Sequence, residues 1–183
     1  MASASPQQPR RNIELKARIA SVDAARPIAA RLATATLGVE RQTDAYFAGA
    51  RGRLKLRERQ GLPAQLVWYA RADGEQAKPS DYLLVDVTDA AALKQALAAA
   101  YGVLVVVDKQ REIYLHENVR IHLDRVEGLG DFLEFEAVLA PDEEDAAGYV
   151  KLAALSREFA IEPPHLVASS YSDLLLVERS SRG

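Results

Sequence analysis

Charged residues recur at every second position along several segments of this chain, and most segments carry mainly one sign of charge. A β-strand directs residues i, i+2 and i+4 to one face. Lysine and arginine grip phosphate oxygens, and carboxylates bind hard divalent cations. The pattern therefore suits a polyanion held together with a divalent metal. The alternating positions are Glu14 and Lys16; Lys55 and Arg57; Lys109 and Arg111; Arg120, His122 and Asp124; and Glu134 and Glu136.

Strands and short turns must position these side chains. A helix is expected at 22–37, with Asp23 available as its N-cap and Gly38 just past its end. Further helices are expected at 89–100 and 143–159, with a short one at 170–177. Hairpin-like connections at 117–118 and 127–130 favour a large antiparallel sheet, closed as a barrel or stacked as a sandwich. The expected strands are 12–19, 39–49, 53–59, 65–71, 82–88, 103–115, 119–126 and 132–140.

Length and composition narrow the class of protein. The 183 residues predict one domain over 12–178, between a disordered tail at 1–11 and a flexible tail at 179–183. The net charge of −3 argues against a nucleic-acid partner, and no segment approaches the roughly 18 apolar residues of a membrane span. The first residues lack the apolar region of a signal peptide. The absence of cysteine excludes disulfides and thiolate metal sites, and it fits the cytoplasm.

The apolar faces of the strands leave two interpretations open. Ile13 and Leu15, like Ile121 and Leu123, alternate with the charged positions. In the simpler interpretation the sheet buries these apolar residues and points its charges at bulk water. However, like charges facing each other across strands are destabilising, and a bound polyanion would compensate them. A charged face lining a closed barrel would have to be hydrated and cross-paired.

In combination, these motifs resemble the CYTH family, also called triphosphate tunnel metalloenzymes, from about residue 12 to about residue 175. The family includes class IV adenylyl cyclases, thiamine triphosphatases and inorganic triphosphatases. Glu14 and Lys16 match the second acid and the lysine of its Glu-x-Glu-x-Lys strand, and Asn12 replaces the first acid. The most specific match is the block 119–136. The other matching segments are Leu54-Lys55-Leu56-Arg57 and Lys109-Gln110-Arg111, and the block itself contains Arg120-Ile121-His122-Leu123-Asp124, Glu127-Gly128-Leu129-Gly130 and Phe132-Leu133-Glu134-Phe135-Glu136.

The resemblance implies an α+β fold, in which an eight-stranded antiparallel β-barrel turns its charged side inward and helices pack outside. It implies Mg²⁺ or Mn²⁺ as cofactor and ATP or another triphosphate as substrate. The 119–136 block is most similar to the class IV adenylyl cyclase branch, which converts ATP to cyclic AMP and pyrophosphate. A triphosphatase releasing orthophosphate is the alternative, and a non-catalytic nucleotide or polyphosphate sensor is the third hypothesis, supported by Asn12. A sheet edge or outer helix could support a homodimer.

The resemblance also implies roles for individual residues. Lys16, Asp124 and Arg120 are the expected catalytic residues. The expected metal ligands are Glu14, Asp124, Glu134 and Glu136, with a salt bridge to an arginine as the alternative for Asp124. The expected substrate-binding residues are Lys16, Lys55, Arg57, Arg71, Lys109, Arg111 and Arg120.

Several further polar residues have more than one candidate role. Asp44 and Tyr46 share a strand face, and they either line the tunnel entrance or make structural hydrogen bonds. Ser80 and Tyr82 could contact a base or sugar. His122 lies beside arginine and aspartate, and we interpret it as a hydrogen-bonded structural residue rather than a base or a metal ligand.

Overall fold

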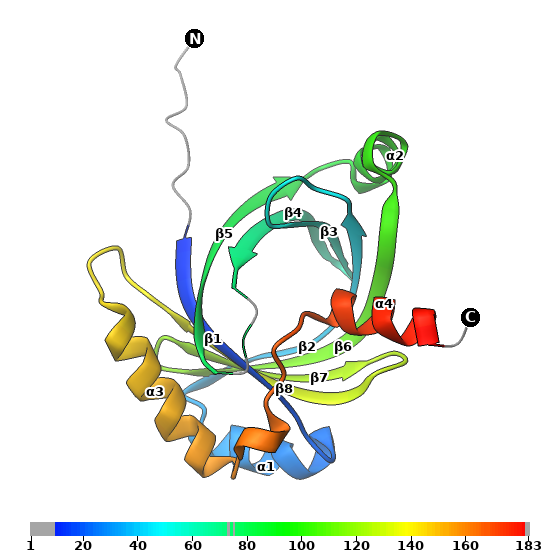
Figure 1. The fold of residues 1–183 in the computed structure, drawn as a ribbon. Helices are drawn as coiled ribbons and strands as arrows, with labels where there is room; N and C mark the ends of the chain where they lie inside the picture. The colour runs from blue at the N-terminus through cyan, green and yellow to red at the C-terminus, as the bar shows by residue number, and fades with distance from the viewer. Residues whose placement is uncertain (1–9, 73, 75, 182–183) are drawn as a thin grey trace.

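The chain forms a closed eight-stranded barrel in the computed structural model, which describes residues 10–72, 74 and 76–181 (Figure 1). Every neighbouring pair of strands is antiparallel, as predicted. The strands are β1 (Arg10–Arg18), β2 (Ala35–Phe47), β3 (Arg53–Arg59), β4 (Leu62–Arg71), β5 (Lys78–Val87), β6 (Val103–His116), β7 (Val119–Val126) and β8 (Gly130–Val138).

The barrel closes through its first strand. The strand order is β1-β5-β4-β3-β2-β6-β7-β8, and β1 is hydrogen-bonded to β5 on one side and to β8 on the other. In the β1–β8 pair, Glu14 lies opposite Glu136 and Lys16 lies opposite Glu134. Closure leaves no unpaired sheet edge and brings the two ends of the predicted acidic motif together.

Helices cover the outside of the barrel. Helix α1 (Val22–Leu32) and helix α3 (Asp145–Glu158) pack against β1, β7 and β8, where Ile13, Ile121 and Phe135 are fully buried. Helix α2 (Ala90–Tyr101) packs on β2 and β3, and α4 (Tyr171–Ser181) packs on β6 beside one opening of the barrel (Figure 1). A short 3₁₀ helix, η1, spans Pro163–His165.

This arrangement decides between the two interpretations of the strand faces. The apolar faces pack outward against the helices, and the alternating charges point into the barrel. The prediction of a tunnel with its charged side inward is confirmed, and the reading in which these charges face bulk water is wrong. The helices stabilise a sheet whose charged face points inward, because they remove its outer apolar face from water.

The first helix is shorter than predicted. Helix α1 ends at Leu32 rather than at residue 37, and its N-cap is Ser21, whose hydroxyl accepts a hydrogen bond from the amide of Asp23. The following residues pair with β6, and the amide of Thr34 already donates to Leu115. Gly38 therefore lies at a bulge in β2, with φ 86°, instead of ending a helix. Long-range strand pairing has overridden local helix propensity.

Other boundaries also differ from the prediction. Strand β5 begins at Lys78 rather than at residue 82, because Lys78 and Ser80 pair with β1. Strand β1 begins at Arg10, and α4 continues to Ser181, so part of each expected tail is regular structure. The remaining tail residues, 1–9 and 182–183, lie outside the described residues.

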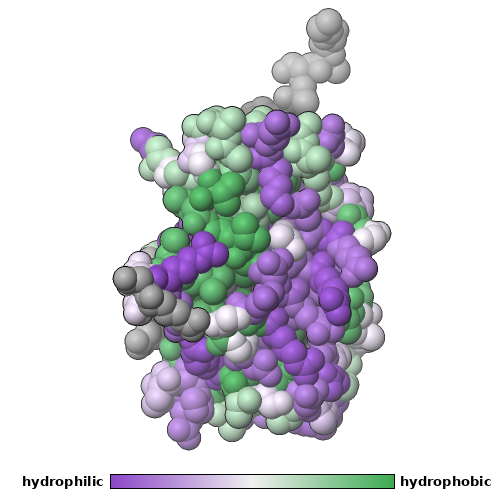
Figure 2. Space-filling model, turned by 90° about the vertical axis from the view of Figure 1, so that its right-hand side faces the viewer, coloured by the Kyte–Doolittle hydropathy of each residue, from purple (hydrophilic) through white to green (hydrophobic). Residues whose placement is uncertain are grey.

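Apolar side chains also gather on one outer face of the molecule (Figure 2). The elements on this side include α2, the start of β6 and α4 (Figure 1), and their exposed apolar side chains are Tyr101, Val103, Leu104 and Val177. No described contact covers this surface, and the homodimer stays a prediction. None of the helices within the described ranges is both long and apolar enough to cross a membrane.

Candidate active site

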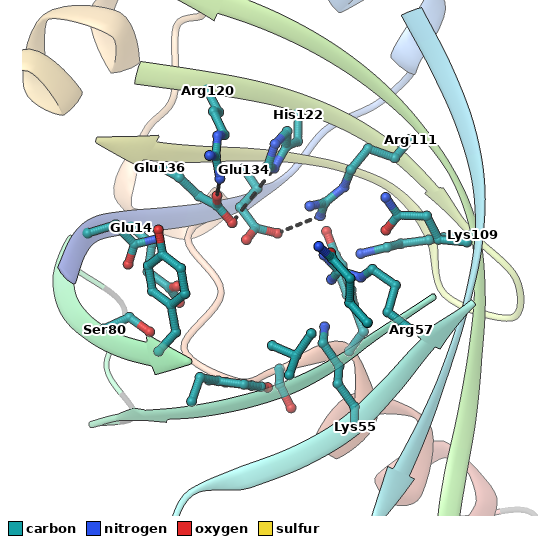
Figure 3. Close-up of a pocket in the computed structure, with 18 of the residues that line it drawn as sticks. Glu14, Lys55, Arg57, Ser80, Lys109, Arg111, Arg120, His122, Glu134 and Glu136 are labelled. Atoms are coloured by element: carbon teal, nitrogen blue, oxygen red, sulfur yellow. Dashed lines mark hydrogen bonds and ion pairs between the residues drawn. The ribbon is translucent and has the colours of Figure 1, made fainter. Parts of the chain in front are cut away.

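A cavity of about 310 Å³ occupies the barrel interior, and strands from all sides of the barrel line it (Figure 3). The structure brings every predicted site residue to this cavity except Asp124, which lies behind its wall. The predicted residues that line it are Glu14, Lys16, Lys55, Arg57, Arg71, Lys109, Arg111, Arg120, Glu134 and Glu136.

Four cations form one side of the cavity, which we call the cationic wall. Lys55 and Arg57 come from β3, and Lys109 and Arg111 come from β6. Between these strands β2 contributes Asp44, only 1% exposed. Its carboxylate accepts hydrogen bonds from Lys55 Nζ at 2.7 Å and Arg57 Nε at 2.9 Å, and Lys109 Nζ lies 4.0 Å away. Asp44 is thus part of the interior charge network.

Asp44 is held ionised by these neighbours. Burial alone would raise its pKa, but the charges of Arg57, Lys55 and Lys109 outweigh burial and hold the pKa well below its usual value. The carboxylate therefore holds Lys55 and Arg57 in place before any ligand arrives, with Lys109 close by. The cationic wall is preorganised for an anion.

Asp124 plays a similar part for Arg111. Arg111 donates to both carboxylate oxygens of Asp124, with Nε 2.6 Å from Oδ1, and the hydroxyl of Tyr171 donates to Oδ2 at 2.8 Å. Burial would raise the pKa of Asp124, but Arg111 and Lys109 hold it well below its usual range. A metal-ligand role for Asp124 would require this pair to open. Its contacts indicate that it positions Arg111.

Three glutamates form the opposite side, which we call the acidic wall. Glu14 comes from β1, and Glu134 and Glu136 come from β8. Glu134 Oε2 lies 3.1 Å from Arg111 Nη2 and 3.8 Å from Lys16 Nζ. The two cations contact the same oxygen, so they leave Oε1 of Glu134 for another ligand.

Glu14 and Glu136 have different counterions. Glu14 accepts a hydrogen bond from Arg71, so a predicted metal ligand and a predicted substrate-binding residue pair with each other. Glu136 is 3.5 Å from Arg120, whose side chain is 39% exposed at the edge of the cavity. Figure 3 shows Glu14, Glu134 and Glu136 on one side of the space and Lys55, Arg57 and Lys109 on the other.

The two glutamates of β8 differ in pKa. Burial would raise the pKa of Glu134, but Lys16 and Arg111 hold it well below its usual value. Burial does raise the pKa of Glu136, and the negative charge of Glu134 raises it further. Glu136 therefore carries the less compensated negative charge of the pair, which would favour a cation beside it.

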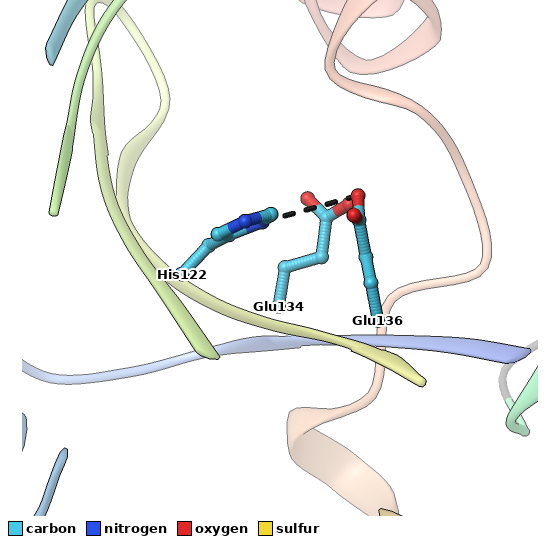
Figure 4. A group of neighbouring side chains, drawn as sticks. All are labelled: His122, Glu134 and Glu136. Carbon is cyan, nitrogen blue, oxygen red and sulfur yellow. Dashed lines mark ion pairs between the residues drawn. The ribbon is translucent and has the colours of Figure 1, made fainter. Parts of the chain in front are cut away.

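His122 lies beside these two glutamates. It projects from β7 opposite Glu134, and one ligand atom each from His122, Glu134 and Glu136 lies within 4.8 Å of the other two (Figure 4). His122 is 3% exposed, and its Nδ1 has no hydrogen-bond partner among the described residues. Burial and the charge of Arg111 lower its pKa well below the usual value. Our interpretation of His122 as a hydrogen-bonded structural residue is therefore wrong for Nδ1, and the donors present fit a divalent metal.

Burial lowers the pKa of two lysines in the cavity. Burial lowers the pKa of Lys16, which lies between Glu134 and the ring of Tyr171. Burial, together with the charge of Arg111, lowers the pKa of Lys109 to about 7. Lys109 can therefore exchange a proton near physiological pH, and Lys16 loses its proton more readily than an exposed lysine.

Some site residues were missed or left open by the sequence reasoning. Tyr171 reaches the cavity from α4, with Lys16 Nζ 3.9 Å and Lys109 Nζ 5.1 Å from its ring centroid. No local pattern signals this contact from a helix outside the barrel. His122, in contrast, shares a strand face with Arg120 and Asp124, so its spacing already placed it inside.

A neutral polar row lies beside the acidic wall. Its members are Asn12 of β1 and Ser80 of β5, which are register partners, and Arg71 of β4 lies opposite Ser80 at the end of the row. Asn12 Oδ1 and the hydroxyl of Tyr82 are buried with no hydrogen-bond partner in the described part of the chain. Because buried polar groups are normally satisfied, these atoms indicate a place for hydrogen bonds from a ligand.

Comparisons with known proteins agree with this geometry. The model of the CYTH domain matches residues 10–171. The PH1012 protein from Pyrococcus horikoshii is 26% identical, with a TM-score of 0.78 over 89% of this chain and 98% of its own. No match is found among curated protein sequences.

Two solved structures share the fold at lower identity. A candidate adenylate cyclase from Vibrio parahaemolyticus is 23% identical, with a TM-score of 0.72 over 92% of this chain and 99% of its own. HpAC1 from Hippeastrum, a candidate adenylyl cyclase described as having a dominant triphosphatase activity, is 16% identical, with a TM-score of 0.64 over 92% of this chain and 96% of its own.

Proposed function

This chain belongs to the CYTH domain family, and from that premise we propose that it is a divalent-metal-dependent enzyme acting on a triphosphate inside the barrel. The preferred reaction is that of a class IV adenylyl cyclase-like protein, which converts ATP to cyclic AMP and pyrophosphate. The observation that carries the proposal is the opposition of the two walls within one cavity. Preorganised cations face carboxylates suited to Mg²⁺ or Mn²⁺, and a metal-bound triphosphate needs both.

The cationic wall would bind the phosphate chain. Arg57 and Arg111 are already fixed by Asp44 and Asp124, so little side-chain entropy is lost on binding. Lys55, which Asp44 holds, and Lys109 add positive charge as ammonium groups rather than as a planar fork. Arg71 and Arg120 would contact phosphate oxygens from the other side of the cavity.

The acidic wall would hold the metal. Glu134 and Glu136 are the first choice of ligands, with Glu14 as their neighbour on β1. The bound ion would neutralise phosphate charge and polarise the phosphorus–oxygen bonds. Asn12 supplies an amide oxygen where the family has an acid, so it adds no negative charge to this wall.

In the cyclase reaction the ribose 3′-hydroxyl attacks the α-phosphorus. The new O3′–P bond forms as the bond to the pyrophosphate oxygen breaks, and the hydroxyl proton must leave. Lys16 is the proposed proton acceptor because burial lowers its pKa and it lies beside Glu134. Arg120 would stabilise the charge on the departing pyrophosphate, and Asp124 would keep Arg111 aimed at the phosphates.

The neutral polar row supports a nucleotide over inorganic triphosphate. An ionised triphosphate offers only acceptor oxygens, whereas Asn12 Oδ1 needs a donor. Ribose hydroxyls or a base amino group would supply one. Ser80 and Tyr82, on the same face of β5, would contact the same part of the nucleotide.

Hydrolysis is the second candidate. The HpAC1 description joins a candidate cyclase with a dominant triphosphatase activity on this fold. In that reaction water attacks the terminal phosphorus and orthophosphate leaves. The same walls serve both reactions, and the outcome depends on which phosphorus lies beside the nucleophile.

Product analysis tests the proposal. The pure protein is incubated with ATP or inorganic triphosphate and either Mg²⁺ or Mn²⁺, and the products are separated by chromatography. Cyclic AMP with pyrophosphate would support the cyclase, and orthophosphate without cyclic product would support the hydrolase. Saturable binding without turnover would overturn both and support the sensor hypothesis.

A further inference from the structure

His122 holds a buried ring nitrogen at the centre of the acidic wall. The Nδ1 atom is enclosed, has no hydrogen-bond partner among the described residues, and lies 3.9 Å from Oε1 of Glu136. That separation is too long for a hydrogen bond, whose limit is about 3.2 Å. Glu136 therefore does not satisfy the nitrogen, although both groups face the same space.

A metal ion would account for this spacing. Nitrogen and oxygen ligands lie about 2.0–2.2 Å from a bound first-row ion, so two ligands of one ion are separated by up to about 4.4 Å. The nearest ligand atoms of His122, Glu134 and Glu136 already lie within 4.8 Å of one another. A small inward rotation of the side chains would complete the set. Figure 4 shows all three side chains converging from β7 and β8.

The electrostatic surroundings are consistent with an ion at this point. Lys16 and Arg111 both contact Oε2 of Glu134, and Arg120 is nearest to Oε2 of Glu136. On each of these two carboxylates the cations lie nearest to Oε2, so Oε1 remains available to a metal ion. A divalent cation would further reduce the repulsion between Glu134 and Glu136, which these cations only partly offset.

The chemistry of the ligands determines which ion is preferred. Mg²⁺ favours oxygen ligands in near-ideal octahedral geometry and retains several waters. Imidazole nitrogen instead suits first-row transition ions, whose affinity for nitrogen ligands exceeds that of Mg²⁺. A site made of two carboxylates alone would discriminate weakly between Mg²⁺ and a first-row transition ion. One added imidazole would favour the transition ion.

We propose that His122 is a direct ligand of the ion held by Glu134 and Glu136, and that it gives this barrel a preference for Mn²⁺ and related transition ions over Mg²⁺. The inference rests on the proposed function only in identifying this ion with the metal of the triphosphate reaction. Metal binding itself can be measured without a nucleotide, so the two proposals can fail separately.

The direct test is pulsed electron paramagnetic resonance of the full chain loaded with Mn²⁺ alone. Echo-envelope modulation from a directly bonded ¹⁴N nucleus is expected in the wild-type protein and is expected to disappear in His122→Ala. A bound Mn²⁺ with no directly bonded nitrogen would overturn the proposal. This reading on the wild-type protein does not depend on how any variant folds.

Calorimetric titration of the same proteins with Mn²⁺ and Mg²⁺ tests the selectivity. His122→Ala is expected to weaken Mn²⁺ binding by about tenfold or more while changing Mg²⁺ binding by less than about threefold. His122→Gln retains a polar side chain and should behave like His122→Ala. His116→Ala is the matched control, because the Nδ1 of His116 lies 2.8 Å from the carbonyl of Leu32, outside the cavity lining, and it should leave both affinities unchanged.

Two results would contradict the selectivity claim: equal losses for both ions, or no loss for either. A bonded nitrogen signal without turnover of any triphosphate would instead leave the ligand assignment intact and overturn the proposed function. Turnover of a triphosphate without a bonded-nitrogen signal would support the proposed function and overturn the assignment of His122 as a ligand.

Discussion

The two walls of the cavity solve the problem of buried charge in opposite ways. On the cationic wall, Asp44 and Asp124 lie among the lysines and arginines and neutralise part of their charge. On the acidic wall, Glu134 and Glu136 lie side by side, and the pKa of Glu136 is raised by burial and by Glu134. The cationic wall contains its own counterions, whereas on the acidic wall the charge of Glu136 is only partly compensated by Arg120. The difference indicates that an anion binds to the cationic wall as it stands, whereas a metal ion bound to the acidic wall would offset the charge of Glu136.

Removing cations from the cationic wall should have the largest effect, a loss of triphosphate binding. Lys55→Ala combined with Arg57→Ala is expected to weaken the binding of inorganic triphosphate by about 3–6 kcal/mol, because charged contacts contribute roughly 1.5–3 kcal/mol each. Calorimetric titration measures the change. Lys94→Ala combined with Arg31→Ala removes two paired cations from outer helices and serves as the control. Unchanged binding in the tunnel variant would mean that the phosphates bind elsewhere.

Neutralising Asp44 on the cationic wall should mainly lower the free energy of unfolding. Asp44→Asn leaves Lys55, Arg57 and Lys109 facing one another without their shared carboxylate. Breaking a buried ion pair from one side costs about 3–5 kcal/mol, and we expect a loss of that size in the free energy of unfolding. Denaturant titration should also show partial recovery when triphosphate is added, since a bound anion replaces the missing charge.

Asp108→Asn is the control for this substitution. Asp108 accepts a hydrogen bond from Thr43 at an exposed position of β6. A similar loss in both variants would show that Asp44 has no special role in holding the cations together.

Neutralising Glu136 on the acidic wall should instead raise the free energy of unfolding. Glu136 lies directly opposite Glu14, and like charges in that relation are destabilising. Glu136→Gln is therefore expected to stabilise the metal-free protein by on the order of 1 kcal/mol. Because the folded-state pKa is raised, the cost of ionising Glu136 is absent at acid pH and develops as pH rises above the unfolded pKa.

Thermal unfolding with and without Mn²⁺ makes the contrast clear. Added Mn²⁺ should stabilise the wild-type protein and have little effect on Glu136→Gln. Destabilisation of the metal-free variant at neutral pH would refute the idea that Glu136 is repelled by the neighbouring glutamates.

Lys109 offers a smaller but sharper test of the cationic wall. Its pKa of about 7 leaves the amine mostly neutral at pH 8, and a bound triphosphate should raise that pKa. Binding at pH 8 should thus take up about one proton, whereas binding at pH 5 should take up almost none at this position. Calorimetry in buffers of different ionisation enthalpy counts the protons. Lys109→Met should abolish the difference, and uptake that persists in this variant would assign it to another group.

Local strand alternation was enough to predict most of the interior. Lys55 with Arg57, and Lys109 with Arg111, share faces by spacing alone, and their common orientation follows from antiparallel pairing. The closure of the sheet into a barrel came from resemblance, because periodicity does not distinguish a barrel from a sandwich. The alternation also placed His122 in the cavity, but its missing hydrogen-bond partner could not be seen without the surrounding atoms.

Other features depend on contacts distant in sequence. Tyr171 reaches Asp124 from a helix that begins well after the last strand. The early end of α1 follows from the pairing of Thr34 and its successors with β6, which competes with an alanine-rich helix pattern. In both cases the deciding interaction lies far along the chain, so no window of neighbouring residues contains it.

The double pairing of β1 has a consequence for how the protein is made. On the ribosome β1 emerges before any other strand, yet its partners are the fifth and the eighth. Until β8 has been synthesised the sheet remains open, and the future interior is an ordinary wet surface on a nascent chain. The lysines and arginines therefore stay hydrated during most of synthesis, and their transfer away from bulk water awaits the final strand. A ribosome stalled after β7 would display an open sheet with two free edges, the form of this chain most exposed to aggregation and most in need of a chaperone.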